Sequence, residues 1–326
     1  MGLERGAHVD RAQGRPVCIT GMHRTGTSVV AALLNRHGLW LGDEADMMAA
    51  NPYNPDGYFE NDGIVALDNA ILATFGGSWS TLPALTGEWT EDPRLLGLKS
   101  GARAIGQGLA ASHLAWGFKD PRAALTLPFW RSVWGDLTVV VALRNPLETA
   151  RSLKRRDGMP IEQGLALWQA HYLSLLNLTT PETRIVVAYE TVCADPVGTA
   201  NALLDRLPGL APVDAAAVCD TVRPALWHFR ETPADLAARG VPHDVLELYA
   251  QLQAEAINPE PHVQDDLASM VRSLPAAIAG LDLAIRDVHV ELQRLAAVVA
   301  RLEGERRAAM PAIEPAPEPS TNGRRD

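Results

Sequence analysis

Residues 16–34 read PVCITGMHRTGTSVVAALL and join three kinds of local structure. Residues 16–20 form a short apolar run, which predicts a buried strand. A loop with glycines at Gly21 and Gly26 follows at once, and the apolar run after it predicts a helix. In a strand–loop–helix unit of this kind, the loop N–H groups and the positive end of the helix dipole can face one anion. The stretch therefore predicts an anion-binding loop at the end of a buried strand.

The loop, residues 21–28, differs at one position from the loop of enzymes that cleave nucleoside triphosphates. Its glycines align with the pattern GxxxxGK[ST], but Thr27 stands where that pattern has lysine, and the loop cation is Arg24. The lysine of the pattern reaches the β- and γ-phosphates. We therefore expect the loop to hold an anion without the usual contact to a γ-phosphate.

Predicted strands and helices alternate along the rest of the chain. Apolar runs at 116–119, 137–143 and 184–189 predict three more strands. The run at 137–143 is uninterrupted, as in parallel strands whose two faces are both covered. Helices are expected at 63–76, 94–112, 146–156, 162–178 and 196–207. This alternation predicts an α/β fold, a P-loop NTPase-like, three-layer, doubly wound parallel sheet.

The predicted strands end in residues that suit anions better than metals. Arg144-Asn145-Pro146 follows the strand at 137–143, and Tyr189-Glu190 closes the strand at 184–189. A nucleotide site that uses Mg²⁺ usually has an Asp at such a strand end. Two anion-binding centres without that Asp favour a nucleotide with two separate phosphate groups over ATP with Mg²⁺, and we expect no metal.

Four stretches of the chain resemble the sulfotransferases that use 3′-phosphoadenosine 5′-phosphosulfate (PAPS), especially a bacterial branch with a GMHR-type loop. Residues 21–28 are similar to the family's 5′-phosphosulfate loop. Arg144 and Ser152 match its 3′-phosphate motif, an arginine and a serine eight residues apart. Residues 116–122 resemble a segment whose lysine approaches the transferred group, and residues 188–196 resemble a structural signature late in the fold.

The resemblance implies a set of site residues. The expected PAPS-binding residues are Arg24, Thr25, Gly26, Thr27, Ser28, Arg144 and Ser152. Lys119 is the implied catalytic cation, which would stabilise charge on the bridging oxygen as the sulfuryl group leaves. An alternative stays open for this stretch: Asp120-Pro121-Arg122 is a structural turn, and Lys119 pairs with Asp120.

A general base is expected, because an acceptor hydroxyl loses a proton as it attacks sulfur. The family uses either a His or a Glu. Glu44 follows the first predicted helix, where some relatives place their base, and Glu60 lies in a loop flanked by aromatic residues. We rank Glu44 and Glu60 nearly equal as catalytic candidates. His23 comes third, since its place in the phosphate loop also suits a contact with the sulfuryl group.

These residues predict metal-free, in-line transfer of a sulfuryl group from PAPS to a hydroxyl or an amine. The acceptor would be a small molecule or a glycan, with a carbohydrate hydroxyl as the first guess. Two rivals remain open. One is a nucleotide-dependent kinase on the same fold, which the missing loop lysine and strand-end Asp disfavour. The other is a catalytically inactive scaffold that recruits partners through its C-terminal helix.

The composition of the 326-residue chain bounds the class of protein. A hydrophobic fraction of 47% and a charged fraction of 21% are typical of a globular protein. The net charge of −10 disfavours nucleic acid as a partner. The three cysteines lack the spacing of a disulfide framework or a zinc site. Without a recognisable signal peptide or a long apolar run, we expect a cytoplasmic protein with no membrane span.

Four segments are expected along the chain. Residues 1–15 are a disordered leader, and residues 16–262 form the α/β domain. Apolar residues recur alternately four and three apart through residues 263–308, a heptad pattern that predicts a long helix or coiled coil. We favour a coiled coil at 276–308, and with it a homo-oligomer, over a helix packed on its own domain. Residues 309–326 are a Pro-rich disordered tail.

Overall fold

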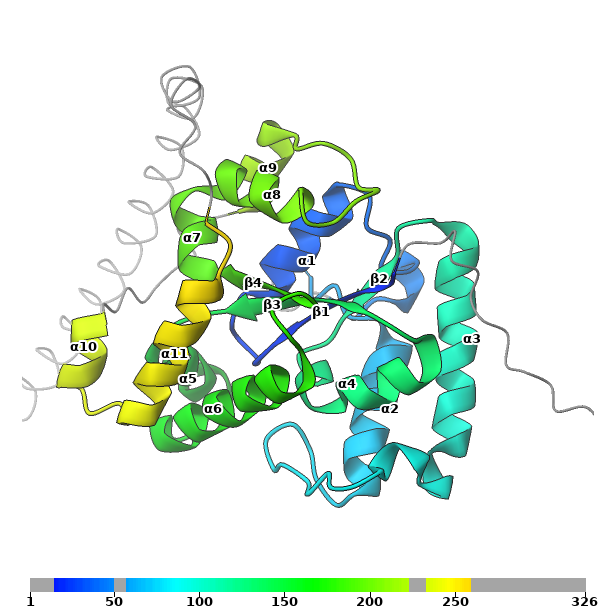
Figure 1. The fold of residues 1–326 in the computed structure, drawn as a ribbon, viewed down its shortest axis with the longest axis horizontal. Coiled ribbons are helices and arrows are strands. Elements are labelled where there is room, and N and C mark those ends of the chain that lie inside the picture. Colours follow the sequence, from blue (N-terminus) through cyan, green and yellow to red (C-terminus); the bar gives the residue numbers. More distant parts are fainter. Residues whose placement is uncertain (1–14, 50–56, 223–232, 259–326) are drawn as a thin grey trace, which may run out of the picture. The chain divides into compact units, whose positions relative to one another are not determined.

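The computed structural model describes residues 15–49, 57–222 and 233–258. A parallel sheet lies at the centre of this part of the chain, with its strands in the order β2-β1-β3-β4 (Figure 1). The strands are β1 (Val17–Gly21), β2 (Gly117–Lys119), β3 (Thr138–Leu143) and β4 (Arg184–Ala188). All three neighbouring pairs are parallel, which confirms the predicted sheet.

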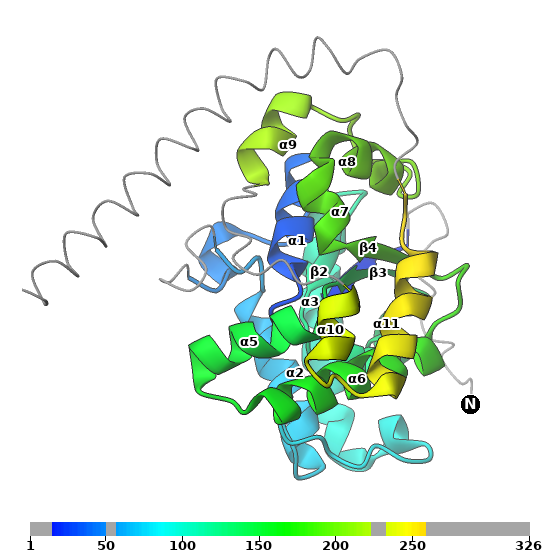
Figure 2. The same cartoon turned by 90° about the vertical axis from the view of Figure 1, so that its left-hand side faces the viewer.

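Helices cover both faces of the sheet (Figure 1 and Figure 2). One face carries α1 (Thr27–Arg36), α7 (Tyr189–Ala194), α8 (Pro196–Leu204) and α9 (Ala215–Thr221). The other carries α4 (Ala123–Trp134), α5 (Pro146–Asp157), α6 (Ile161–Leu178) and α11 (His243–Glu255). Successive strand residues alternate between the two cores: Ile19 packs on the first side and Cys18 on the second. The predicted three-layer, doubly wound architecture is confirmed.

The remaining described helices complete the domain around this sandwich. α2 (Asp62–Thr74) and α3 (Leu96–Ser112) pack on each other and on α4. Short 3-10 helices occupy the connections: η1 (Glu44–Asp46), η2 (Trp89–Glu91) and η3 (Pro93–Leu95). The short helix α10 (Pro233–Ala238) precedes α11. None of the helices in the described ranges combines the length and apolarity needed to cross a bilayer.

Asparagine caps fix the starts of two helices that border the sheet edge. The Asn61 side chain accepts hydrogen bonds from two backbone N–H groups and caps α2. Asn145 caps α5 in the same way, and Pro146 occupies the first helical position. A cap of this kind stabilises a helix start by about 1 kcal/mol. These caps hold the backbone next to Glu60 and Arg144, which each precede a cap by one residue.

The sequence pattern misplaces some ends of these elements. The strand predicted at 184–189 ends one residue early, because Tyr189 begins α7. The helix predicted at 196–207 ends at Leu204. The helix predicted at 94–112 is preceded by the 3-10 turn η3 and is α-helical only from Leu96. The pattern does not predict α4, which contains Pro128 in its interior, where proline is usually excluded.

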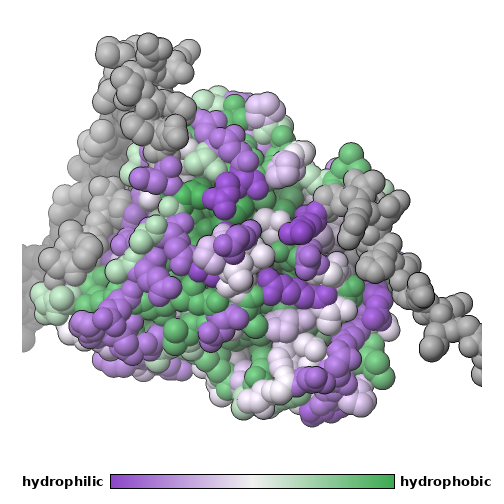
Figure 3. All heavy atoms as spheres, in the orientation of Figure 1, coloured by the Kyte–Doolittle hydropathy of each residue, from purple (hydrophilic) through white to green (hydrophobic). Residues whose placement is uncertain are grey.

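Three predicted segments lie outside the described residues: the leader at 1–15 apart from Arg15, the coiled coil within 263–308, and the tail at 309–326. These stay predictions. Among the described residues, Cys18 and Cys193 are buried and Cys219 is exposed, and none of the three forms a disulfide. The face shown in Figure 3 intersperses hydrophilic and apolar residues.

Candidate active site

The loop at the end of β1 is a tight turn that requires glycine. Gly26 precedes α1 in the left-handed conformation, with φ 91° and ψ 12°. Arg24 also has a positive φ, of 71°, which is uncommon for a residue with a Cβ atom. The Thr25 Oγ1 atom donates a hydrogen bond to the Met22 carbonyl oxygen across 2.7 Å. A Cβ atom at Gly26 would lie 2.5 Å from the Tyr189 ring, so only glycine fits there.

Three strands bring their carboxyl ends to this loop. In the sheet register, Gly21 lies opposite Ala142, and Leu143 lies opposite Ala188. The segments that follow β1, β3 and β4 therefore meet at one edge of the sheet. This edge is where open α/β sheets bind their ligands.

The residues that are expected to bind PAPS come from two of these segments, and they contact one another. The Arg24 Nε atom donates a hydrogen bond to Ser152 Oγ across 3.0 Å, and the Arg144 Nη1 atom donates to the Arg24 carbonyl oxygen across 3.4 Å. Arg144 Nε also donates to Glu148 Oε2 at 3.0 Å, and its guanidinium carbon lies 4.6 Å from the Tyr189 ring centroid. The structure thus brings Arg24, Arg144 and Ser152 together, with Ser152 bound to Arg24.

Positive charge is concentrated around Arg24. Burial lowers the pKa of the Arg24 guanidinium, and the charges of Arg156 and Arg144 lower it further. An arginine remains protonated despite such a shift. The lowered pKa therefore reports repulsion between neighbouring cations, which a bound anion would relieve.

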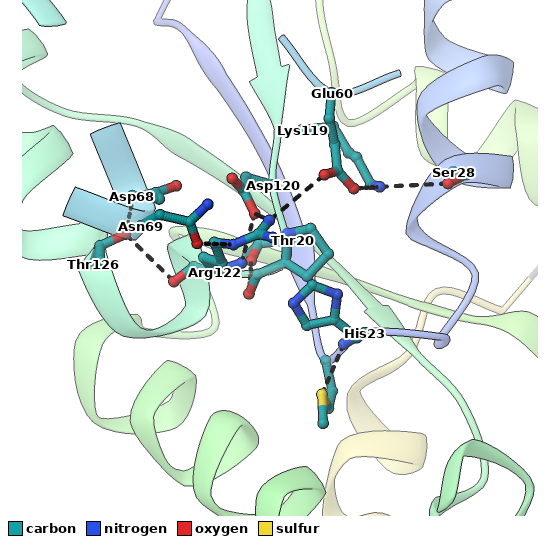
Figure 4. Close-up of polar contacts among 12 residues, drawn as sticks. Thr20, His23, Ser28, Glu60, Asp68, Asn69, Lys119, Asp120, Arg122 and Thr126 are labelled. Carbon is teal, nitrogen blue, oxygen red and sulfur yellow. Dashed lines mark hydrogen bonds and ion pairs between the residues drawn. The ribbon is translucent and has the colours of Figure 1, made fainter. Parts of the chain in front are cut away.

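Lys119, Glu60 and Ser28 form a second chain of contacts beside the loop (Figure 4). Lys119 Nζ forms an ion pair with Glu60 Oε1 and donates to Ser28 Oγ across 3.4 Å. The Lys119 side chain is 2% exposed and that of Glu60 is 5% exposed. The ion pair therefore connects the end of β2 with the residue before the α2 cap. The hydrogen bond to Ser28 connects the same lysine with the first turn of α1.

Arg122, to which the sequence analysis assigned no role of its own, belongs to this cluster. Its Nη1 atom lies 3.0 Å from Asp120 Oδ1 and 3.6 Å from Glu60 Oε2, and its Nε atom donates to Asn69 Oδ1 across 2.8 Å (Figure 4). Asp120 pairs with Arg122, and Lys119 pairs with Glu60. The alternative in which Lys119 pairs with Asp120 is therefore wrong.

His23 is buried next to the same cluster. Its ring centroid lies 4.2 Å from that of Trp79, a residue that the sequence pattern did not mark. Burial holds the pKa of His23 well below its ordinary value, and the charges of Arg122 and Arg156 lower it further. Within the described part of the chain, its Nε2 atom has no hydrogen-bond partner. His23 is therefore a neutral imidazole at physiological pH.

Glu44 lies apart from these contacts. It is the first residue of η1, and its side chain is exposed. In the described ranges, the Glu44 side chain has no ion pair or hydrogen bond with the other expected site residues. The structure therefore places one of the two leading base candidates, Glu60, against Lys119, and leaves the other in solvent.

The site offers cations, hydroxyl groups and buried carboxylates, Glu60 among them, at a single sheet edge. Within the described residues, no group of three or more His, Cys, Asp or Glu side chains is arranged to hold a metal ion. The arrangement suits an anionic substrate whose reacting group lies between the loop and Glu60, because cations would neutralise its charge and Glu60 could accept a proton.

The chain was compared with curated proteins and with solved structures. No curated protein matches the chain. The sulfotransferase domain of the Synechococcus PCC 7002 olefin synthase is similar at 15% identity and a TM-score of 0.45, over 75% of this chain and 96% of that domain. The sulfotransferase STF9 from Mycobacterium avium is 15% identical, with a TM-score of 0.41, over 74% of each chain.

The family assignment depends on neither of these distant structures. The model of the sulfotransferase family matches residues 16–211, which is more than half of the 326 residues. The matched range includes the loop after β1, the Lys119 segment and both members of the Arg144 and Ser152 pair. The chain therefore belongs to the sulfotransferase family.

Proposed function

We propose that this sulfotransferase moves a sulfuryl group from PAPS to a hydroxyl or amine acceptor, with Glu60 as the general base. The observation that supports this most directly is the contact chain from Ser28 through Lys119 to Glu60. It joins the anion-binding loop to a buried carboxylate. A transfer reaction needs both a site for the donor's charge and a group that takes the acceptor's proton.

PAPS, the donor that the family generally uses, carries a 5′-phosphosulfate and a 3′-phosphate. In our proposal, Arg24 and the N–H groups of residues 25–28 bind the 5′-phosphosulfate, and Arg144 and Ser152 bind the 3′-phosphate. A guanidinium can bind two phosphate oxygens at once. The repulsion among the cations near Arg24 supports this fit, since it favours an anion at this edge. When bound, PAPS supplies the sulfuryl group.

Glu60 takes the proton of the acceptor in this reaction. As the acceptor oxygen or nitrogen forms its bond to sulfur, the bond between sulfur and the bridging phosphate oxygen breaks. The electron pair of the broken bond stays on that oxygen, and adenosine 3′,5′-bisphosphate is the second product. Glu60 is preferred to Glu44 because it is buried beside the loop, where its proton acceptance can be coupled to the transfer.

Lys119 couples the two halves of the reaction. As long as Glu60 is ionised, the carboxylate attracts the Lys119 ammonium. Proton uptake neutralises Glu60, so that Lys119 becomes available to negative charge that develops on the bridging oxygen. Preorganised cations at developing charge supply a large share of catalysis in many enzymes. Ser28, which Lys119 already contacts, lies on the loop side of this cation.

The acceptor is a small molecule or a glycan in this proposal, and a carbohydrate hydroxyl is the first to test. We propose that the segment at 76–92 helps to line the acceptor site. Trp79 from this segment contacts the His23 ring, and the Arg156 guanidinium lies 5.6 Å from the centroid of the Trp79 ring. These contacts support an acceptor approach from the side of Trp79.

Calorimetry with the full chain tests the donor assignment. We expect tight binding of adenosine 3′,5′-bisphosphate without Mg²⁺, and weak binding of ATP with or without it. A preference for ATP with Mg²⁺ would overturn the proposal in favour of a kinase. A variant without residues 263–326 should retain bisphosphate binding, because all the proposed donor contacts lie outside that segment. Acceptor-dependent release of adenosine 3′,5′-bisphosphate from PAPS then identifies the acceptor among hydroxyl and amine compounds.

A further inference from the structure

Two buried aspartates lie next to each other at the active-site ion pairs (Figure 4). Asp68 on α2 and Asp120 after β2 are both 0% exposed. The Oδ1 atom of Asp68 accepts hydrogen bonds from Thr126 Oγ1 across 2.5 Å and from Trp130 Nε1 across 2.9 Å. The Oδ1 atom of Asp120 accepts from the Arg122 backbone N–H across 2.8 Å and from Arg122 Nη1 across 3.0 Å. Each carboxyl group therefore uses only one of its oxygens for these donors.

The second oxygen of each group is the unusual feature. Within the described residues, neither Asp68 Oδ2 nor Asp120 Oδ2 receives a hydrogen bond from an N–H or O–H group. An ionised carboxylate oxygen buried without a donor is costly. A proton held on one carboxyl group and donated to the other would satisfy both oxygens together. Two neighbouring carboxyl groups that share one proton are a known solution to this problem.

The charges of the buried cluster, which consists of Glu60, Asp68, Lys119, Asp120 and Arg122, also favour one protonated carboxyl group. Lys119 and Arg122 are its cations, and Glu60 and Asp120 pair with them directly. An ionised Asp68 would be a third anion against two cations. The Cys18 thiol also lies near both aspartates: burial raises its pKa, the charges of both aspartates raise it further, and the charge of Arg131 lowers it. Arg131 donates to the Leu178 carbonyl oxygen.

We infer that Asp68 holds a proton that it donates to Asp120, and that this carboxyl pair positions Arg122 beside Glu60. Asp68 is the protonated member because Asp120 faces the Arg122 guanidinium, which stabilises its charge. The protonation of Asp68 is independent of the proposed function. The positioning of Arg122 beside Glu60 rests on the proposed role of Glu60 as the base. Asp68 and Asp120 are positioning residues, since they act on the reaction through Arg122.

The shifts in the pKa values of Asp68 and Asp120 agree with a proton on Asp68. Burial raises the pKa of Asp68 well above its ordinary value, and the charge of Asp120 and a hydrogen bond to Asp120 raise it further. Burial also raises the pKa of Asp120, but the charge of Arg122 opposes that rise. The proton therefore resides on Asp68, which forms no ion pair within the described part of the chain, rather than on Asp120, which pairs with Arg122.

The consequence for catalysis lies in the two contacts of Arg122 with carboxylates. Asp120 and Asn69 hold the guanidinium so that it lies 3.6 Å from Glu60, farther than the 3.0 Å to Asp120. If Asp120 lost its charge, Arg122 would be attracted more strongly to Glu60. A carboxylate that lies closer to a cation accepts a proton less readily, because nearby positive charge favours its ionised form. The aspartate pair therefore preserves the basicity of Glu60.

Infrared spectroscopy of the full chain tests where the proton resides. At neutral pH we expect a carbonyl band of a protonated carboxyl group that responds to ¹³C-labelling of aspartate. This band should be absent from Asp68→Asn and present, shifted, in Asp120→Asn. A wild-type protein without an aspartic acid band, or an Asp68→Asn protein that retains the band, would overturn the protonation of Asp68. Neither result depends on activity or on the identity of the acceptor.

The dependence of kcat on pH tests the positioning role. Asp68→Asn replaces the acid by an amide that still donates to Asp120, so we expect kcat at pH 7 within about threefold of wild type. In the wild type, ionisation of Asp68 at alkaline pH would place two adjacent carboxylates beside Arg122, so we expect kcat to change there, and Asp68→Asn should lack that change. Asp120→Asn should lower kcat by about ten- to a hundredfold, because Arg122 moves, with little change in the KM for PAPS. Asp120→Glu, which keeps the charge, should recover part of the loss.

Other outcomes would refute this role. An unchanged alkaline limb in Asp68→Asn, or wild-type kcat in Asp120→Asn, would show that the pair does not act on Glu60. Urea unfolding of each variant shows whether a loss of kcat reflects unfolding, and the infrared result holds even for a variant with low activity. Glu60→Gln separates the two proposals: full activity in that variant would refute Glu60 as the base, while the infrared band would still decide the state of Asp68.

Discussion

Arg24 in the loop after β1 and Ser152 in α5 are 128 positions apart in the chain, yet the Arg24 Nε atom donates a hydrogen bond to Ser152 Oγ across 3.0 Å. The sequence resemblance assigns these residues to different phosphate groups of the donor. Their contact means that the two proposed anion-binding centres share a hydrogen bond. A change at either residue should therefore affect both ends of the nucleotide.

Ser152→Ala should weaken the binding of adenosine 3′,5′-bisphosphate by about tenfold, since a hydrogen bond to a charged group contributes about 1.5 kcal/mol or more. Calorimetry measures this loss. Ser174→Ala is the matched control, because Ser174 Oγ donates to the Ala124 carbonyl oxygen away from the loop, and its binding should equal that of wild type. Wild-type affinity in Ser152→Ala would contradict a role for this hydroxyl in the site.

Arg144→Lys should weaken binding of adenosine 3′,5′-bisphosphate much more than binding of adenosine 5′-phosphate. Lysine keeps the charge beside Glu148 but cannot bind two phosphate oxygens in the way a guanidinium does. We expect a loss of about thirtyfold for the bisphosphate, which corresponds to about 2 kcal/mol. Competition binding with the two nucleotides gives the ratio, and an equal loss for both would remove the 3′-phosphate assignment.

Glu60→Gln should lower kcat by about a hundred- to ten-thousandfold, the usual contribution of a general base. The affinity for adenosine 3′,5′-bisphosphate should change little, because Glu60 is not proposed to contact the nucleotide. Glu44→Gln is the paired variant and should keep wild-type kcat, since Glu44 is exposed. A large loss of kcat in Glu44→Gln together with wild-type kcat in Glu60→Gln would show that Glu44 is the base.

Gly26→Ala should destabilise the protein more than Gly38→Ala. Both glycines have a positive φ, 91° and 99°, so each alanine has a similar backbone cost, of about 1–3 kcal/mol. Only the Cβ atom at position 26 would collide with the Tyr189 ring, whereas nothing lies within 4 Å of one at position 38. Urea unfolding gives both free energies, and equal losses would show that the Tyr189 ring moves aside without cost.

Stability should decline as the pH falls from about 6.5 to about 4, in part through His171. Burial lowers the pKa of this fully buried imidazole from 6.5 to about 4. The unfolded chain therefore binds more protons than the folded chain in this window, and unfolding becomes easier as the pH falls. The shift corresponds to about 3 kcal/mol from His171 as an order of magnitude. Buried His23 contributes in the same direction.

His171→Asn should flatten this decline without abolishing it. An asparagine amide can replace the Nδ1 group that contacts the Leu167 carbonyl oxygen across 2.7 Å, and it does not titrate. His243→Asn is the control, because the His243 side chain is 83% exposed. Unfolding free energies at several pH values decide the matter: an undiminished slope in His171→Asn would mean that other groups cause the loss.

The sequence predicted the features of the site that depend on near neighbours in the chain. The apolar run of β1, the glycines of the loop and the strand-end position of Arg144 are local patterns, and each lies where it was expected. The fold followed from them because alternating strands and helices have few arrangements. The ends of elements were less predictable, as Tyr189 shows, because a helix can begin where a strand pattern continues.

The partners of the buried charges were not predictable in this way. Lys119 and Glu60 are 59 positions apart, and nothing in either local sequence excludes the pairing of Lys119 with Asp120. The choice depends on how α2 packs against the end of β2, which is a tertiary contact. Asp68 was missed for the same reason: an acidic residue in an amphipathic helix normally faces solvent, and only the structure shows it buried against Thr126 and Trp130.

The central place of β1 in the sheet has a consequence for biosynthesis. β1 leaves the ribosome first, but its neighbours are β2 and β3, which begin at Gly117 and Thr138. Until those residues have been translated, a nascent chain contains an apolar strand with both edges open, the kind of segment that pairs wrongly with other chains. The loop that follows β1 can reach its final geometry only after the second half of the sheet has been made. This enzyme is therefore expected to need protection by chaperones during translation more than a protein whose first strand lies at an edge.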